Sequence, residues 1–119
     1  DAWVRKLNSD DYQIGLSPGS FSNISVMTQV YRWYPVGQSG TIPTAKIESR
    51  NTGVGYMLEA ALPWSILGAT VTSGNEYGFV LSVSDNDSVD VAVQESMVSS
   101  LATRELSDPS TWGKIKLIR

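Results

Sequence analysis

The sequence predicts an all-β protein built as an antiparallel β-sandwich. Short segments with alternating polar and apolar residues recur along the chain, and Gly, Pro, Asn and Asp separate them. Helical periodicity extends over no more than about one turn. At 119 residues, the chain is long enough for one hydrophobic core and too short for two. We therefore expect residues 1–119 to form a single domain.

The first part of the chain contains three candidate strands. Tyr12–Leu16 ends at the turn Ser17–Ser20. Ile24–Tyr34 is the longest β-prone run, and large side chains alternate onto both of its faces. Beyond the Gly-rich connection 35–42, Thr44–Arg50 is polar and is expected at a sheet edge. The loop Asn51–Gly53 ends this strand.

The segment Gly55–Gly68 changes from a strand to a helical turn at a single proline. Alternate residues before the proline share one face, namely Tyr56, Leu58, Ala60 and Leu62, while Met57, Glu59 and Ala61 take the other. Pro63 lacks a backbone donor, which ends the strand and suits the start of a helix. We expect one helical turn over Pro63–Leu67, ending at Gly68.

Three candidate strands follow in the last part of the chain. Glu76–Ser84 alternates, with Tyr77, Phe79, Leu81 and Val83 expected to point inward. Met97–Ala102 has a weaker strand pattern, and Lys114–Ile118 closes the chain. The sheets are thus expected to form from seven short strands in total.

Composition excludes several classes of function. Nine basic residues are scattered among twelve acidic ones, for a net charge of −3, so nucleic acid is not an expected partner. Cysteine and histidine are both absent, which removes thiol catalysis and zinc chemistry. No apolar run is long enough to span a bilayer and no signal peptide is visible. We expect a mature chain or one excised from a longer protein.

Three sequence blocks, in order, resemble the family 9 carbohydrate-binding modules. They are the strand and Trp turn Gly55–Gly68, the Gly-Phe strand Gly78–Asp87, and Asp108–Leu117, where Asp-Pro precedes an aromatic residue and Gly. The resemblance covers about the last two thirds of the chain. It implies a jelly-roll type of β-sandwich with a polysaccharide or oligosaccharide site on one side, in a secreted, extracellular or cell-surface protein.

The resemblance also implies missing strands at the N-terminus. Complete modules of this family have several strands before the position of Tyr12, where this chain has eleven residues. The chain would then be a C-terminal portion of a larger module. Because unpaired sheet edges recruit other strands, a second polypeptide or self-association would complete the sheet. The alternative is a smaller, divergent module that folds alone.

Aromatic rings are the natural tools for sugar binding, because the C–H faces of a pyranose stack on them. Trp33, flanked by Tyr31 and Tyr34, is the best candidate for an exposed platform, although a tryptophan in such a strand also serves as a core residue. Trp64 and Trp112 occupy positions where the family has structural aromatics. We expect these two to pack and not to bind ligand.

The family's two-tryptophan sugar clamp is not present at the aligned positions, which hold Leu7 and Leu106. Trp3 lies close enough in sequence to substitute for one of them. Gln13 and Ser82 occupy the clamp's polar positions and can hydrogen-bond sugar hydroxyls. We therefore expect any sugar affinity to be weak, or to lie elsewhere than in the family's site.

A calcium site is expected in the acidic loop that follows the Gly-Phe strand. Asp85, Asp87 and Asp90 offer carboxylates at the flexible spacing that calcium accepts, and Asp85 aligns with a family aspartate. Family members carry structural calcium. The alternative is a solvated turn in which Asp and Asn side chains cap their own backbone.

Nothing in the sequence pairs an acid with a recognisable catalytic partner. The carboxylates available for glycoside hydrolysis are Asp10, Asp11, Glu59, Asp85, Asp87, Glu95 and Asp108. Glu59 is expected to face solvent, and Asp108 to form a turn. The leading hypothesis is a non-catalytic extracellular carbohydrate-binding module of a glycan-active or surface protein. The alternative is a structural subunit that assembles a surface layer or filament from the same sandwich.

Overall fold

The computed structural model describes residues 6–86, 88, 91 and 93–118. Contacts within the described chain gather into two units, Asn8–Thr70 and residues 71–118 with Lys6 and Leu7. Every strand pairing in both units is antiparallel. The predicted class, an all-β antiparallel sandwich, is confirmed, and the described residues contain three short 3-10 helices where one helical turn was expected.

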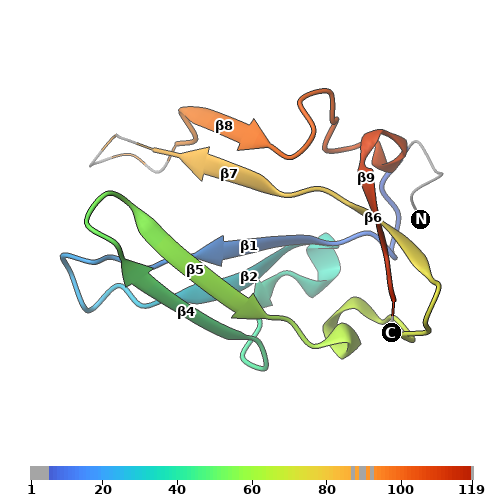
Figure 1. The fold of residues 1–119 in the computed structure, drawn as a ribbon, viewed down its shortest axis with the longest axis horizontal. Helices are drawn as coiled ribbons and strands as arrows, with labels where there is room; N and C mark the ends of the chain where they lie inside the picture. The colour runs from blue at the N-terminus through green and yellow to red at the C-terminus, as the bar shows by residue number, and fades with distance from the viewer. Residues whose placement is uncertain (1–5, 87, 89–90, 92, 119) are drawn as a thin grey trace. The chain divides into compact units, whose positions relative to one another are not determined.

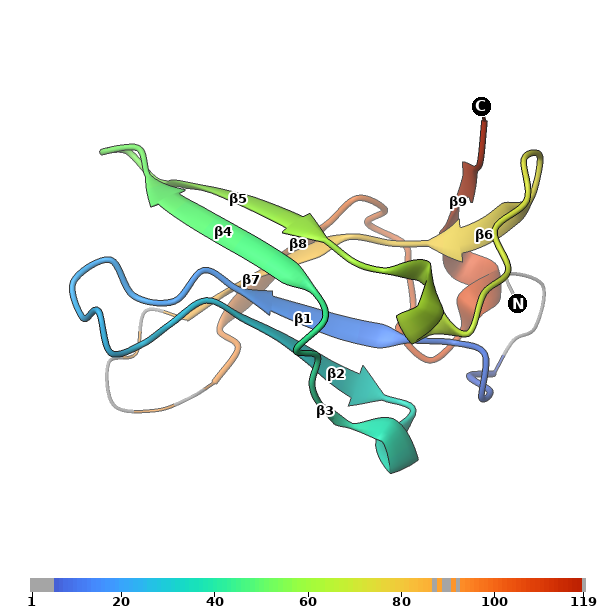
Figure 2. The same ribbon diagram turned by 90° about the horizontal axis from the view of Figure 1, so that it is seen from below.

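The unit Asn8–Thr70 contains a three-stranded sheet and a hairpin (Figures 1 and 2). The sheet has the order β1-β2-β3, with β1 at Gln13–Ser17, β2 at Gln29–Tyr34 and β3 at Gly40–Thr41. The hairpin joins β4 (Lys46–Asn51) to β5 (Tyr56–Ala61). Two short 3-10 helices, η1 (Val36–Gln38) and η2 (Trp64–Leu67), follow β2 and β5.

The second unit contains two separate two-stranded sheets. Strand β6 (Glu76–Phe79) pairs with β9 (Gly113–Lys116), and β7 (Ser82–Asp85) pairs with β8 (Ser96–Ser99). The 3-10 helix η3 (Pro109–Thr111) precedes β9. Gly113 begins β9 at a close approach, because a Cβ there would lie 3.1 Å from the Phe79 carbonyl oxygen.

The turn from β5 into η2 forms as the sequence predicts. Pro63 is the extended residue before η2, so the helical turn begins one residue later than the expected Pro63–Leu67. Gly68 ends it in the left-handed conformation with φ of 58°, which a residue without Cβ adopts at low cost. On the expected inward face, Leu58 and Leu62 are half-buried, but Tyr56 and Ala60 are exposed, so burial follows the predicted alternation only at the two leucines.

Arg32 of β2 links the three-stranded sheet to both short helices of its unit. Its Nη1 donates to Gln38 Oε1 over 2.9 Å, and its Nη2 donates to the Ile66 carbonyl. The guanidinium also lies 5.4 Å from the centre of the Tyr12 ring, within cation–π range. Two residues earlier in the sequence, Val30 is buried to 3% exposure, and Ile42 is the other buried apolar side chain among the residues that the structure describes.

The long strand expected over Ile24–Tyr34 is wrong in its first half. β2 begins at Gln29, and Ile24 is 89% exposed. A turn replaces the strand, because Asn23 Oδ1 accepts from Ser25 N and the Asn23 carbonyl accepts from Val26 N. These local polar contacts compete with strand pairing, and here they outweigh the β propensity of the apolar residues.

The single strand expected over Glu76–Ser84 is also corrected. It divides at Val80 and Leu81 into β6 and β7, which belong to different sheets. Leu81 instead joins the β7–β8 hairpin, since Ser100 N donates to its carbonyl over 2.8 Å. Phe79 and its expected inward-pointing partners Leu81 and Val83 are about half exposed, because each of these sheets has only two strands.

Candidate functional site

The best candidate site lies on β2, where Trp33 and Tyr31 form an aromatic pair. Their ring centroids are 4.5 Å apart and the rings are tilted by 50°. Trp33 is 57% exposed, whereas Tyr31 is half-buried beside it. Such an arrangement offers one open ring face, supported by a second ring. We call Tyr31 and Trp33 the aromatic platform.

A β-bulge positions Trp33. Across the β1–β2 ladder, Ile14 pairs with Arg32 and Gln13 pairs with Tyr34, so Trp33 is the extra residue without a partner. Bulges bend a strand locally and redirect the side chains that they carry, and they are common beside functional sites. The alternation in the sequence gave no sign of this bulge, since nothing in the pattern specifies which residue β1 skips.

Gly15 on the neighbouring strand makes room for the indole. A Cβ at this position would lie 3.3 Å from Trp33 Cδ1 and only 2.7 Å from Trp33 Nε1, and the second distance is shorter than Cβ contacts in proteins. The indole therefore lies against bare backbone of β1. Sequence reasoning missed Gly15, because its role depends on a partner eighteen residues further along the chain.

Of the other predicted sugar-binding residues, some lie near the aromatic platform and others do not. Gln13 is exposed and pairs with Tyr34 at the bulge, so the structure brings both to the edge of the platform. Ser82 lies in the other unit, where its hydroxyl hydrogen-bonds that of Ser99 over 2.7 Å. Trp3 lies outside the described residues.

The two tryptophans expected to pack differ in exposure, since Trp112 is half-buried and Trp64 is exposed. Trp112 Nε1 donates to the Glu105 carbonyl over 3.0 Å, which ties it to the turn before η3. Trp64 begins η2 and is 36% exposed. Neither joins the aromatic platform in the ring contacts of the described chain.

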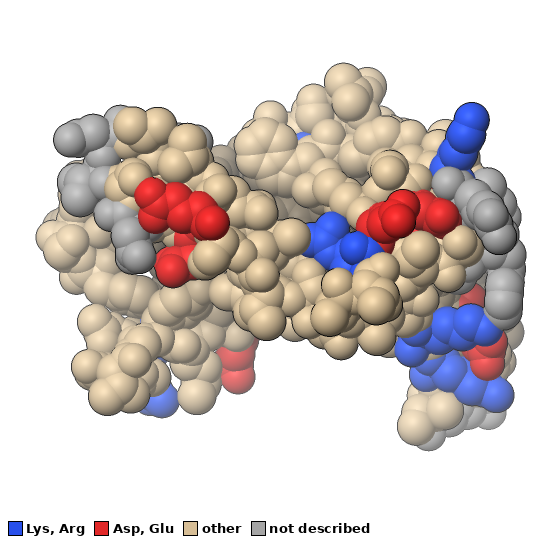
Figure 3. All heavy atoms as spheres, turned by 90° about the horizontal axis from the view of Figure 1, so that it is seen from above, with Lys and Arg blue, Asp and Glu red and all other residues tan. Residues whose placement is uncertain are grey.

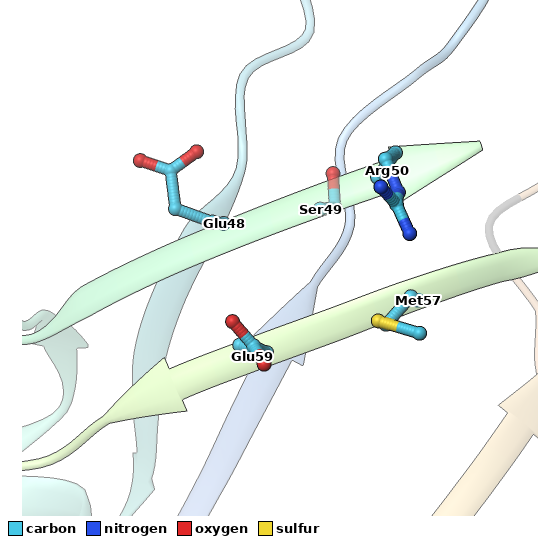
Figure 4. Close-up of a pocket in the computed structure, with 5 residues that line it drawn as sticks. All are labelled: Glu48, Ser49, Arg50, Met57 and Glu59. Atoms are coloured by element: carbon cyan, nitrogen blue, oxygen red, sulfur yellow. The ribbon is translucent and has the colours of Figure 1, made fainter.

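A second feature of the same unit is a shallow hollow of about 480 Å³ on the β4–β5 hairpin (Figure 4). It is lined by Glu48, Ser49, Arg50, Met57 and Glu59. Glu48 and Glu59 are directly opposed across the two strands, and both are exposed. The predicted solvent-facing position of Glu59 is confirmed, but its partner Glu48 was not among the expected carboxylates.

The opposed glutamates do not make an enclosed acid–base pair. Hydrolysis of a glycoside needs one carboxyl group held protonated in a protected site while the other is ionised. Glu48 and Glu59 lie on an open strand surface. Lys46 and Arg50 are two residues from Glu48 on β4 and diagonal to Glu59. The arrangement is that of a solvated charged face.

Two more of the candidate carboxylates serve local structure. Asp108 Oδ1 accepts from Ser110 N over 3.0 Å and from Ser110 Oγ over 2.6 Å, which confirms the expected turn. Asp11 is 4% exposed, and its Oδ2 accepts from Asn8 N over 2.9 Å. These contacts cap turns in the backbone.

The expected calcium loop is only partly described. Asp85 ends β7, whereas Asp87 and Asp90 lie outside the described residues. In the described part of this loop, Asn86 uses both side-chain polar atoms locally, since Oδ1 accepts from Ser88 N and Nδ2 donates to the Val91 carbonyl. No group of three metal-ligating side chains occurs among the residues that the structure describes.

Figure 3 shows acidic and basic side chains on the same face, with several Lys and Arg side chains gathered beside an acidic one at the lower right. None of the helices in residues 6–86, 88, 91 and 93–118 has the length and hydropathy needed to cross a bilayer.

The antiparallel β-sheets define the chain as a β-sandwich protein, and on β2 the exposed Trp33 lies beside the half-buried Tyr31. The model of the carbohydrate family 9 binding domain-like family matches residues 23–119, and the chain belongs to this family. No curated protein and no solved structure matches the chain. The family match begins after β1, so Gln13 and Gly15 lie outside it.

Proposed function

We propose that the protein is a non-catalytic polysaccharide-binding module that holds a sugar ring on the aromatic platform. Membership of the carbohydrate family 9 binding domain-like family supports carbohydrate as the ligand class. The observation that carries the proposed site is the exposed indole of Trp33, backed by Tyr31 and seated over Gly15. A pyranose would stack its C–H face on this indole.

The platform offers contact to one side of a sugar only, in contrast to a clamp of two tryptophans. Affinity from a single stacking surface is modest, because one face of the sugar stays in water. Gln13 and Tyr34 at the bulge supply an amide and a hydroxyl for hydrogen bonds to sugar hydroxyls. An open platform of this kind suits a residue within a polysaccharide chain as well as a chain end.

The test is affinity electrophoresis of the protein in gels that contain neutral soluble polysaccharides. We expect retardation of the wild-type chain, and its loss in Trp33→Ala. Trp33→Phe keeps an aromatic face and should retain part of the retardation. Trp112→Phe is the matched control, since it changes a tryptophan that is anchored in a turn. Retardation that survives Trp33→Ala would exclude the platform.

An extracellular or cell-surface location and a structural calcium ion are part of this proposal. The family resemblance supports both, and Asp85 with Asp87 and Asp90 would hold the ion. We expect calcium to raise the melting temperature of the wild-type chain and to leave that of an Asp85→Ala, Asp87→Ala double variant unchanged. An equal rise in both proteins would rule out this loop as the calcium site.

A second candidate function is assembly through sheet completion by another polypeptide or a second copy. The β4–β5 sheet has only two strands, and its strand β5 carries the exposed side chains Tyr56 and Met57. An exposed strand edge with apolar side chains favours pairing with another strand. Sedimentation of the purified chain tests this, because a monomer at all accessible concentrations would exclude self-association.

A further inference from the structure

A second hollow lies on the β7–β8 hairpin, in the unit that does not carry the aromatic platform. It has a volume of about 310 Å³ and is lined by Met97, Val98, Ser99, Ala102 and Arg104. All of these residues belong to β8 and the turn that follows it. The hollow is therefore formed locally, by a turn that folds back on its own strand.

Arg104 is held in place at one edge of this hollow. Its Nε donates to Ser99 Oγ over 3.0 Å, and its Nη2 lies 2.8 Å from Met97 Sδ. Both contacts are made to neutral groups. Arg104 is half-buried, so the guanidinium is fixed against β8 and does not extend freely into solvent.

The charge of Arg104 is not matched by a carboxylate in the part of the chain that the structure describes. Its hydrogen bonds there go to Ser99 and Met97. An arginine stays protonated at all physiological pH values, and its guanidinium has more N–H donors than these two contacts use.

Two hydroxyl groups extend the polar edge of the hollow. Ser99 Oγ, which accepts from Arg104, also shares a hydrogen bond with Ser82 Oγ. Ser82, Ser99 and Arg104 thus form one continuous polar line across β7, β8 and the following turn. Val98 and Ala102 supply apolar contact at the same hollow.

We propose that this hollow binds the carboxylate of a uronic acid residue in an acidic polysaccharide, with Arg104 as the anion-binding residue. The inference rests on the proposed carbohydrate-binding function and specifies a second, separate site. A guanidinium recognises a planar carboxylate through paired N–H donors, which gives geometric specificity as well as charge. Ser82 and Ser99 would bond ring hydroxyls, while Val98 and Ala102 contact the sugar's C–H groups.

The chain has a net charge of −3, so selective binding of an acidic polymer would point to a specific site on the protein. A negatively charged chain does not attract polyanions by its overall charge. Retention of an acidic polysaccharide therefore requires a local cationic site, and a nonspecific ion-exchange effect is not expected.

The test compares polygalacturonate with its fully methyl-esterified form, which keeps the backbone and removes the negative charge. We expect the wild-type chain to bind the acid form about tenfold more tightly, as one charge-assisted contact would give. Arg104→Gln should abolish this preference and leave binding to the ester unchanged. Arg104→Lys keeps the charge without the paired donors, and should retain only part of the preference.

Arg50→Gln is the matched control, because it removes the same charge from an exposed position on β4. It should preserve the preference for the acid form. Equal binding of acid and ester by the wild-type chain would overturn the inference, as would an Arg104→Gln variant that keeps the preference. Near-ultraviolet circular dichroism checks that each variant is folded.

The same ligands and variants distinguish the Arg104 site from the aromatic platform. Loss of ester and neutral-glycan binding in Trp33→Ala, with no acid preference in the wild type, would support the platform and exclude the Arg104 site. An acid preference that depends on Arg104 and persists in Trp33→Ala would support the Arg104 site alone.

Discussion

The indole of Trp33 lies against Gly15, at a distance that leaves no room for a side chain on the neighbouring strand. Even one methyl group there would lie 2.7 Å from Trp33 Nε1. The atoms in conflict belong to the indole and not to the backbone, so a substitution can be absorbed by displacing the ring. Gly15 on β1 therefore determines the position of Trp33, the proposed sugar-binding residue.

Gly15→Ala should displace the indole and weaken glycan binding several-fold while the chain stays folded. The expected loss of unfolding free energy is about 1 kcal/mol or less, because a side chain and not the backbone has to move. Tryptophan fluorescence and affinity electrophoresis measure the two effects. Gly55→Ala is the control, since a Cβ there meets nothing within 4 Å. Unchanged glycan binding in Gly15→Ala would contradict the proposal that the position of the indole against Gly15 matters for binding.

Arg32→Met should destabilise the protein by about 2 kcal/mol, because two hydrogen bonds from a charged group are lost together. Methionine keeps most of the aliphatic stem, which isolates the effect of the guanidinium. Urea unfolding gives the free-energy change. Arg50→Met, on an exposed strand position, should change stability by no more than about 0.5 kcal/mol. Equal losses in both variants would show that Arg32 has no special linking role.

Glu48→Gln should stabilise the chain slightly, because it removes one of two like charges directly opposed on β4 and β5. Cross-strand pairs of this kind are worth about 0.2–1 kcal/mol. The gain should shrink as salt is added, since both side chains are exposed and screened. Thermal melts at low and high ionic strength measure it. A loss of stability at low salt would mean that Glu48 makes a favourable pair with Arg50 or Lys46 instead.

Asp108→Ala should cost about 1 kcal/mol, because the carboxylate accepts from the backbone of Ser110 at the start of η3. Asp108→Asn keeps an acceptor oxygen and should cost less. Chemical unfolding of the two variants side by side makes the comparison. An Asn variant as unstable as the Ala variant would argue against the cap.

Sequence reasoning succeeded where the determining contacts are local. The strand β5, its end before Pro63 and the stop at Gly68 follow from residues within one turn of each other. The loop at Asn51 also forms as expected, since Asn51 Oδ1 accepts from Gly53 N over 2.7 Å. In each of these cases the residue types alone specify the backbone conformation.

Sequence reasoning failed where partners come from distant parts of the chain. Glu76–Ser84 divides into β6 and β7 because the two parts pair with β9 and β8, respectively. The alternation of apolar residues does not specify these pairing partners. For the candidate site, Trp33 and Tyr31 were identifiable as aromatic neighbours, but Gly15 and the bulge were not. Arg104 was missed because its proposed role depends on its contacts with Ser99 and Met97, which only the folded chain reveals.

The pairing of β6 with β9 has a consequence for the order in which the chain folds. The β1–β2, β4–β5 and β7–β8 ladders each join segments that are near neighbours in sequence, whereas β6 and β9 are separated by residues 80–112. Closing that longer loop costs the most chain entropy before any hydrogen bond is gained. The three local hairpins can therefore form early, and we expect the pairing of β9 with β6 to be the rate-limiting step of folding.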